Sequence, residues 1–239
     1  MKFNLPNTFT CLNLFCGCIA AVMIFRNHLD YAAYLVFVAT FFDLLDGMAA
    51  RKGSGNSAFG KELDSLADAV SFGFVPGAIL FKMLQHTDMD LFFDSELFIR
   101  IIQFFPFIVT VFSALRLAKF NLDTRQTTSF IGLPTPANTL LIVSFPLILN
   151  QFPGSWDSLF LNPYFILIFS MISSYLLISE LPLFSLKFKT LAFSENRFQY
   201  ILLLLALILM PIFLFAAIPI LVILYLLLSL IQNFTKATT

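Results

Sequence analysis

The chain has 239 residues, of which 59% are hydrophobic, 16% aromatic and only 12% charged. Because a soluble domain averages about 25% charged residues, this composition excludes an ordinary soluble domain and favours an all-α, polytopic membrane protein. The 14 basic and 14 acidic residues cancel, so no excess of positive charge points to a nucleic-acid partner. We expect a single integral membrane domain over residues 1–239.

Long apolar stretches recur along the chain, and a helix needs roughly 20 such residues to cross a bilayer. They predict about eight membrane-spanning helices, over residues 6–26, 30–51, 62–85, 97–118, 134–151, 159–181, 197–213 and 215–234. The last two are separated by little more than Pro211 and Pro219. These two helices show no motif, and we expect them to be scaffold.

Lysine and arginine near the ends of these spans predict the orientation of the chain. If the N-terminus is cytoplasmic, that side holds Lys2, Arg51, Lys52, Lys61, Arg116, Lys119, Arg125, Lys187, Lys189, Arg197 and Lys236. The opposite side then holds only Arg26, Lys82 and Arg100. The positive-inside rule therefore favours a cytoplasmic N-terminus and an even number of spans.

Residues 43–68, DLLDGMAARKGSGNSAFGKELDSLAD, concentrate charge at the edge of two predicted spans. Asp43 and Asp46 share one face of a helix, and Asp64 and Asp68 share a face of the next, because residues three or four apart are neighbours on a helix. The segment from Lys52 to Gly60 is expected to be the turn between them. Charged residues in apolar helices are costly and usually functional, so we expect these helices to bring four carboxylates together.

Four carboxylates in one place repel one another and need positive charge among them. Oxygen ligands without histidine or cysteine favour Mg²⁺, Mn²⁺ or Ca²⁺, and two such ions commonly assist displacement at phosphorus. Gly47 and Gly60 would let a nucleotide or phosphate approach the helix backbone. Arg51 offers a planar fork for phosphate oxygens. The predicted metal ligands are Asp43, Asp46, Asp64 and Asp68.

The spacing D-x2-D-G-x2-A-R-x8-G-x3-D-x3-D, from Asp43 to Asp68, resembles the signature of the CDP-alcohol phosphotransferase superfamily at every fixed position. The resemblance implies a six-helix catalytic core, here over about residues 5–190, with the helices at 197–234 outside it. It also implies a homodimer in the inner cell membrane, with an active site that faces the cytoplasm and holds about two divalent ions. Asp68 would take the proton from the incoming hydroxyl group.

A second polar region, SALRLAKFNLDTRQTTSFIGLPTPAN, covers residues 113–138. Arg116, Lys119 and Asn121 leave a predicted span at the end that holds the aspartates. They could anchor the helix at lipid headgroups, or bind the lipid phosphate or the carboxylate of an acceptor alcohol. The blocks RLAKFN and GLPTPA resemble the phosphatidylserine synthase branch of the superfamily, with Lys119 where arginine is commoner and Asn138 where small residues are usual.

This branch resemblance implies transfer of a phosphatidyl group from CDP-diacylglycerol to L-serine, giving phosphatidylserine and CMP. One alternative keeps the chemistry with another alcohol, such as glycerol 3-phosphate or an inositol compound. A phosphorylated acceptor would need a denser basic cluster than Arg116, Lys119 and Arg125 provide. Another alternative is a divalent-cation transporter, but a permeation path would need polar residues through the whole bilayer, whereas these acids gather at one edge.

Overall fold

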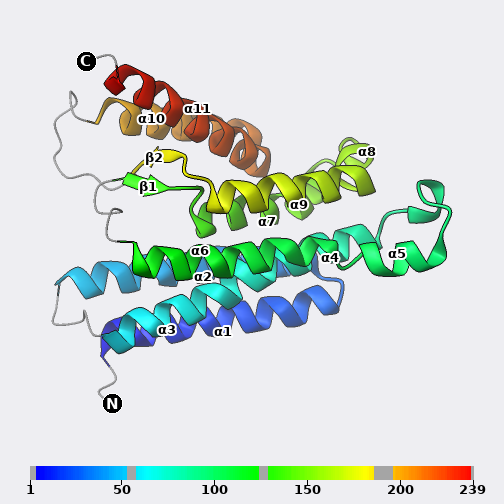
Figure 1. Ribbon diagram of the computed structural model, residues 1–239, viewed down its shortest axis with the longest axis horizontal. Helices are drawn as coiled ribbons and strands as arrows, with labels where there is room; N and C mark the ends of the chain where they lie inside the picture. Colours follow the sequence, from blue (N-terminus) through cyan, green and yellow to red (C-terminus); the bar gives the residue numbers. More distant parts are fainter. Residues whose placement is uncertain (1–3, 53–57, 124–128, 186–195, 238–239) are drawn as a thin grey trace.

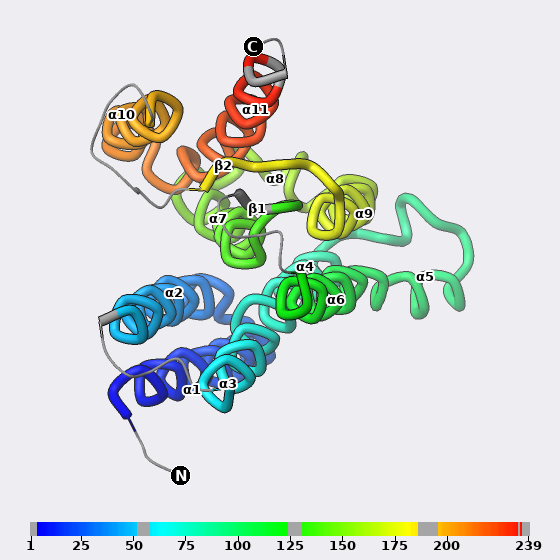
Figure 2. The backbone as a smooth tube through the Cα atoms, turned by 60° about the vertical axis from the view of Figure 1, so that its left-hand side comes forward, coloured from blue at the N-terminus to red at the C-terminus, as the bar shows by residue number. Residues whose placement is uncertain are grey.

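A computed structural model describes residues 4–52, 58–123, 129–185 and 196–237, which fold into a bundle of long helices (Figure 1). The first half contains α1 (Leu5–Phe25), α2 (Leu29–Lys52), α3 (Ala58–Asp68), α4 (Val75–Gln85), α5 (Glu96–Ile102) and α6 (Ile108–Leu122). The second half contains β1 (Ser129–Ile131), α7 (Thr135–Gln151), α8 (Asp157–Phe160), α9 (Pro163–Ile178), β2 (Pro182–Phe184), α10 (Arg197–Phe213) and α11 (Ala217–Ala237). Figure 2 shows α1, α2 and α3 on one side and α7, α9, α10 and α11 on the other.

The structure confirms a polytopic helical membrane protein. Within the described residues, five helical stretches are long and apolar enough to cross a bilayer: Leu5–Phe25, Leu29–Arg51, Ala58–Gln85, Glu96–Leu122 and Arg197–Asn233. The predicted spans at 134–151 and 159–181 correspond to the shorter helices α7 and α9, of 17 and 16 residues. The fifth stretch contains α10 and α11, which lie side by side in Figure 1. The number of spans, eight, stays a prediction.

The turn between α10 and α11 lies at η4 (Leu214–Ala216), between the two prolines that suggested a break. Leu214 has a φ of 48°, a left-handed conformation that is uncommon for a non-glycine residue. Pro211 lies inside α10. The chain therefore reverses three residues after this proline.

The predicted span at 62–85 is one helix in three parts. A π-helical turn, η1 (Ala69–Phe74), joins α3 to α4 and begins directly after Asp68. The Thr110 hydroxyl donates to the Gly73 carbonyl at 3.0 Å, and the Thr139 hydroxyl donates to the Phe72 carbonyl at 2.8 Å. Helices α6 and α7 thus hold the π turn, a feature that often occurs at functional sites.

Small residues bring α1 close to the π turn. A Cβ atom added at Gly17 would lie 2.3 Å from Ser71 Oγ, so only glycine allows this approach. On its other side α1 packs along α2, in which Ala32, Ala33 and Val36 are completely buried. Helix α1 therefore packs tightly between α2 and α3–η1, the elements that carry the aspartates.

A two-stranded antiparallel ribbon of β1 and β2 lies at the end of the bundle and was not anticipated in an all-α fold. Gly132 follows β1 with a φ of +75°, and a Cβ atom there would lie 2.7 Å from the Leu177 carbonyl oxygen. The Tyr225 hydroxyl of α11 donates to the Phe184 carbonyl at 2.9 Å. The ribbon thus connects α7 and α9 with the C-terminal helix.

Candidate active site

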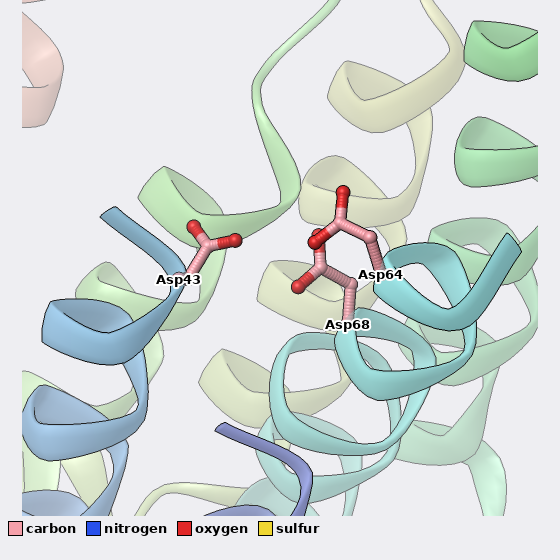
Figure 3. Close-up of side chains that lie close together, drawn as sticks. All are labelled: Asp43, Asp64 and Asp68. Carbon is pink, nitrogen blue, oxygen red and sulfur yellow. The ribbon is translucent and has the colours of Figure 1, made fainter. Parts of the chain in front are cut away.

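Three of the four motif aspartates come together between α2 and α3. Carboxylate oxygens of Asp43, Asp64 and Asp68 lie within 4.8 Å of one another. In Figure 3, Asp43 points from α2 toward Asp64 and Asp68, which project from successive turns of α3. The i, i+4 spacing of the sequence therefore produces the expected juxtaposition.

The fourth aspartate, Asp46, lies outside this group of three. It is 7% exposed, and its Oδ2 accepts a hydrogen bond of 2.8 Å from the Thr10 hydroxyl of α1. The bond compensates part of the cost of burying a carboxylate. Asp46 is therefore held by α1, one helical turn from Asp43.

Helix α1 also holds Asp68, through a contact that the sequence did not predict. The Asn13 side-chain amide donates to Asp68 Oδ1 at 3.2 Å, and the Asn13 backbone carbonyl accepts from Ser71 Oγ at 3.0 Å. Asn13 is fully buried and Asp68 is 8% exposed. The available signal was the recurrence of Asn7, Thr10, Asn13 and Gly17 every three or four residues, which predicts a polar face on an apolar helix.

The cluster of the three carboxylates fits a divalent cation. Its donors are all oxygen atoms, and Asp64 Oδ1 is buried with no hydrogen-bond partner in the described part of the chain. A buried carboxylate oxygen without a partner is costly. A hard cation at this position would satisfy that oxygen and offset the repulsion among the three carboxylates.

The predicted nucleotide-binding residues lie next to the aspartates along the chain. Gly47 and Arg51 are one turn apart on α2, and a Cβ atom added at Gly47 would lie 3.8 Å from an Arg51 guanidinium nitrogen. Arg51 is exposed and Gly47 is half-buried. Gly60 lies in the first turn of α3 and not in the predicted turn, since α3 begins at Ala58; residues 53–57 of that turn lie outside the described residues.

Arg116 is the most buried of the predicted basic residues, at 6% exposure. One of its terminal nitrogens donates to the Thr135 hydroxyl at 2.9 Å, and its guanidinium lies 5.8 Å from the centre of the Phe120 ring. Its Nε has no partner among the residues described. A buried guanidinium with an unused donor is suited to an anionic ligand.

Lys119 and Asn121 bind neighbouring segments instead. Lys119 Nζ forms an ion pair with Glu180, which follows α9. The Asn121 side-chain amide donates to Ser65 Oγ at 2.7 Å, while the Asn121 backbone carbonyl accepts from Lys61 Nζ at 2.8 Å. These contacts fasten the end of α6 to α3 and to the segment before β2; Arg125 lies outside the described residues.

Residues 3–178 match the CDP-alcohol phosphatidyltransferase family. The matched region covers α1 to α9 and every predicted site residue. The chain belongs to this family. Helices α10 and α11 lie beyond the matched region.

The similar proteins include several that are named CDP-diacylglycerol–serine O-phosphatidyltransferase. The protein of Helicobacter pylori (strain ATCC 700392 / 26695) is 34% identical over 162 residues, or 66% of this chain and 64% of that protein. The Bacillus subtilis (strain 168) protein is 32% identical over 59% of this chain and 75% of its own length. That of Methanocaldococcus jannaschii is 36% identical over 60% of each. The chain therefore spans somewhat less than two thirds of the Helicobacter relative.

Proposed function

We propose that the chain transfers the phosphatidyl group of CDP-diacylglycerol to the hydroxyl group of L-serine, which gives phosphatidylserine and CMP. The observation that carries the proposal is the group of Asp43, Asp64 and Asp68, whose oxygens lie within 4.8 Å in a chain of this family. The names of the relatives support serine as the acceptor.

Asp43, Asp64 and Asp68 would hold one or two divalent ions, Mg²⁺, Mn²⁺ or the larger Ca²⁺, with Asp46 as a fourth ligand from α2. When bound, such ions neutralise charge on the pyrophosphate and on the departing CMP. Asp46 keeps one oxygen on Thr10, so it would offer the other. The all-oxygen donor set and the unpartnered Asp64 oxygen support this assignment.

Asp68 is the proposed base. The serine oxygen forms a bond to the phosphorus that carries the diacylglycerol, the bond from that phosphorus to the CMP oxygen breaks, and the hydroxyl proton passes to Asp68. Asn13 binds Asp68 Oδ1, which fixes the plane of the carboxylate and therefore the direction of its second oxygen. A positioned base contributes about 10² to 10⁴-fold to a rate.

The remaining predicted residues would bind the two substrates. Gly47, Arg51 and Gly60 would line the cytidyl and phosphate side. Arg116 would bind the lipid phosphate or the serine carboxylate through its unused Nε. Lys119 and Asn121 would contribute at the mouth of the site, where Lys119 would exchange its Glu180 partner for the ligand.

The chain would act as a homodimer in the inner cell membrane, with its aspartates at the cytoplasmic side. Five apolar helical stretches support an integral membrane protein, and Arg51, Lys61, Arg116 and Lys119 gather at the aspartate-bearing end. We further propose one integral membrane domain over residues 1–239, in which residues 5–190 form the catalytic core and residues 197–234 are scaffold.

Acceptor exchange tests the proposal. Purified protein would be incubated with CDP-diacylglycerol, Mn²⁺ or Mg²⁺, and radiolabelled L-serine, glycerol 3-phosphate or inositol in parallel reactions. We expect label from serine to enter lipid, with equimolar release of CMP, and a chelator to abolish both. Label that enters lipid only from glycerol 3-phosphate or inositol would support phosphatidyl transfer but reject serine as the acceptor. No transfer to any alcohol would reject the proposed function.

A further inference from the structure

A large groove lies on the side of α7 that faces α9, η4 and α11, and it has no role in the proposed reaction. Its volume is about 680 Å³, within the range of small-molecule sites. Its walls are aromatic and aliphatic, including Phe145, Phe169 and Ile223. Helix α11 supplies one wall and lies beyond the region that matches the family, whereas α7 and α9 lie within it.

One buried polar group with an unused donor borders this apolar groove. Asn138 lines it and is fully buried. The Asn138 oxygen accepts a hydrogen bond of 2.7 Å from Ser173, whereas its Nδ2 has no partner in the segments described. A buried amide donor without an acceptor is costly, so an occupant that offers an oxygen atom at this depth would be favoured.

The groove does not lead directly to the aspartates. Thr135 and Thr139 of α7 face Arg116 and the π turn, whereas Asn138 faces Ser173 of α9. Helix α7 itself therefore separates the groove from the catalytic side.

The dimensions and chemistry fit one acyl chain of a membrane lipid. The groove follows α7 from Asn138 to Ile148, or about 15 Å at 1.5 Å per residue, which equals roughly half of a 30 Å hydrocarbon core. The α10–α11 stretch beside the groove is long and apolar enough to cross a bilayer, so lipid acyl chains are the apolar molecules available to the groove. An ester carbonyl at the head of a chain supplies the acceptor that Asn138 lacks.

We propose that this groove binds a resident glycerophospholipid, distinct from the reacting lipid, with one acyl chain along α7 and an ester oxygen on Asn138 Nδ2. The bound chain fills the space between the catalytic helices and the α10–α11 hairpin. The proposal does not depend on the transferase activity, because binding can be measured without turnover.

Photocrosslinking tests the proposal in the full-length protein. The protein would be reconstituted in vesicles of phosphatidylglycerol that carries a diazirine in one acyl chain, irradiated, and mapped by peptide mass spectrometry. We expect crosslinks to concentrate on the groove walls of α7, α9 and α11. Equal labelling of exposed residues outside the groove, such as Ile168 and Leu207, would overturn the proposal.

Matched variants sharpen the test. Ile223→Trp fills the groove and should lower groove labelling roughly tenfold, which corresponds to about 1.4 kcal/mol of binding free energy. Leu227→Trp, on the same helix but outside the groove, should leave it unchanged. Asn138→Ala should weaken retention about fivefold, the equivalent of one hydrogen bond. Unchanged labelling in Ile223→Trp would contradict the proposal even if Asn138→Ala failed to fold.

Two other occupants are distinguishable in the same experiment. If unlabelled CDP-diacylglycerol displaces the label while plain phosphatidylglycerol does not, the groove holds the reacting lipid and the resident lipid is rejected. If the groove residues stay unlabelled and Ile223→Cys instead forms a disulfide between two chains, a second copy of the protein occupies the groove. Displacement by plain phosphatidylglycerol supports the proposal.

Discussion

The two sides of the bundle relate differently to the sequence. On the side of α1, α2 and α3, helical spacing placed Asp64 and Asp68 on one face of α3, and the packing of α2 beside α3 brought Asp43 to them. On the side of α7, α9 and α11, the ribbon, the Lys119–Glu180 pair and the groove arise from contacts between residues far apart in the chain. Local periodicity thus predicts groups that share a helix face, while long-range pairing decides what supports them.

The largest expected effect lies on the aspartate side. Asp68→Asn keeps the shape and most hydrogen bonds but removes the proposed base, so we expect kcat to fall by about 10² to 10⁴-fold. The exposed Asp90→Asn is the matched control and should be neutral. Serine incorporation into lipid measures both. An Asp68→Asn variant with more than a tenth of normal kcat would show that this carboxylate is not the base.

The next effect tests whether α1 belongs to the catalytic side. Asn13→Ala removes the hydrogen bond to Asp68, and bonds to charged groups contribute about 1.5–3 kcal/mol, or roughly tenfold to hundredfold in rate. We expect kcat to fall with little change in the KM for serine. Thr8→Ala, exposed on α1, is the control. Equal kcat values for the two variants would show that α1 only packs against the catalytic helices and does not position Asp68.

Thr135 connects the two sides because it holds Arg116 from α7. Thr135→Val deletes this acceptor, and we expect the KM for the anionic substrate that Arg116 binds to rise about tenfold. Thr135→Ser should restore it because the hydroxyl returns. If Thr135→Val lowers the thermal stability without changing this KM, and Thr135→Ser does not restore the KM, the contact is purely structural.

The smallest effect concerns Lys119 and Glu180. Both side chains are partly exposed, at 39% and 63%, and such pairs contribute about 0–1 kcal/mol. A double-mutant cycle with Lys119→Ala and Glu180→Ala should give a coupling free energy of unfolding in this range, and salt should reduce it. A coupling free energy well above that range would show that the pair stabilises the fold. That result would contradict the proposal that Lys119 exchanges Glu180 for a ligand.

The sequence predicted the helices, their membrane character and the grouping of Asp43, Asp64 and Asp68, because apolar length and i, i+4 spacing are local properties. It also placed Asp46 in this group, but the structure holds Asp46 on Thr10 instead. It did not predict the π turn after Asp68, since η1 continues directly from α3 into α4. Nor did it show that Asn121 bonds to Ser65, or that Lys119 pairs with Glu180 some 60 residues later. Those partners are set by how α6 meets α3 and α9.

Binding of Mn²⁺, followed by electron paramagnetic resonance, tests the central claim most directly. The purified protein would be titrated with Mn²⁺ beside Asp64→Asn, which alters the buried carboxylate with the unpartnered oxygen, and Asp90→Asn. We predict that the wild type and Asp90→Asn bind about two ions per chain when CDP-diacylglycerol is present, and that Asp64→Asn loses this binding. Unchanged Mn²⁺ binding by Asp64→Asn would contradict a metal centre between α2 and α3.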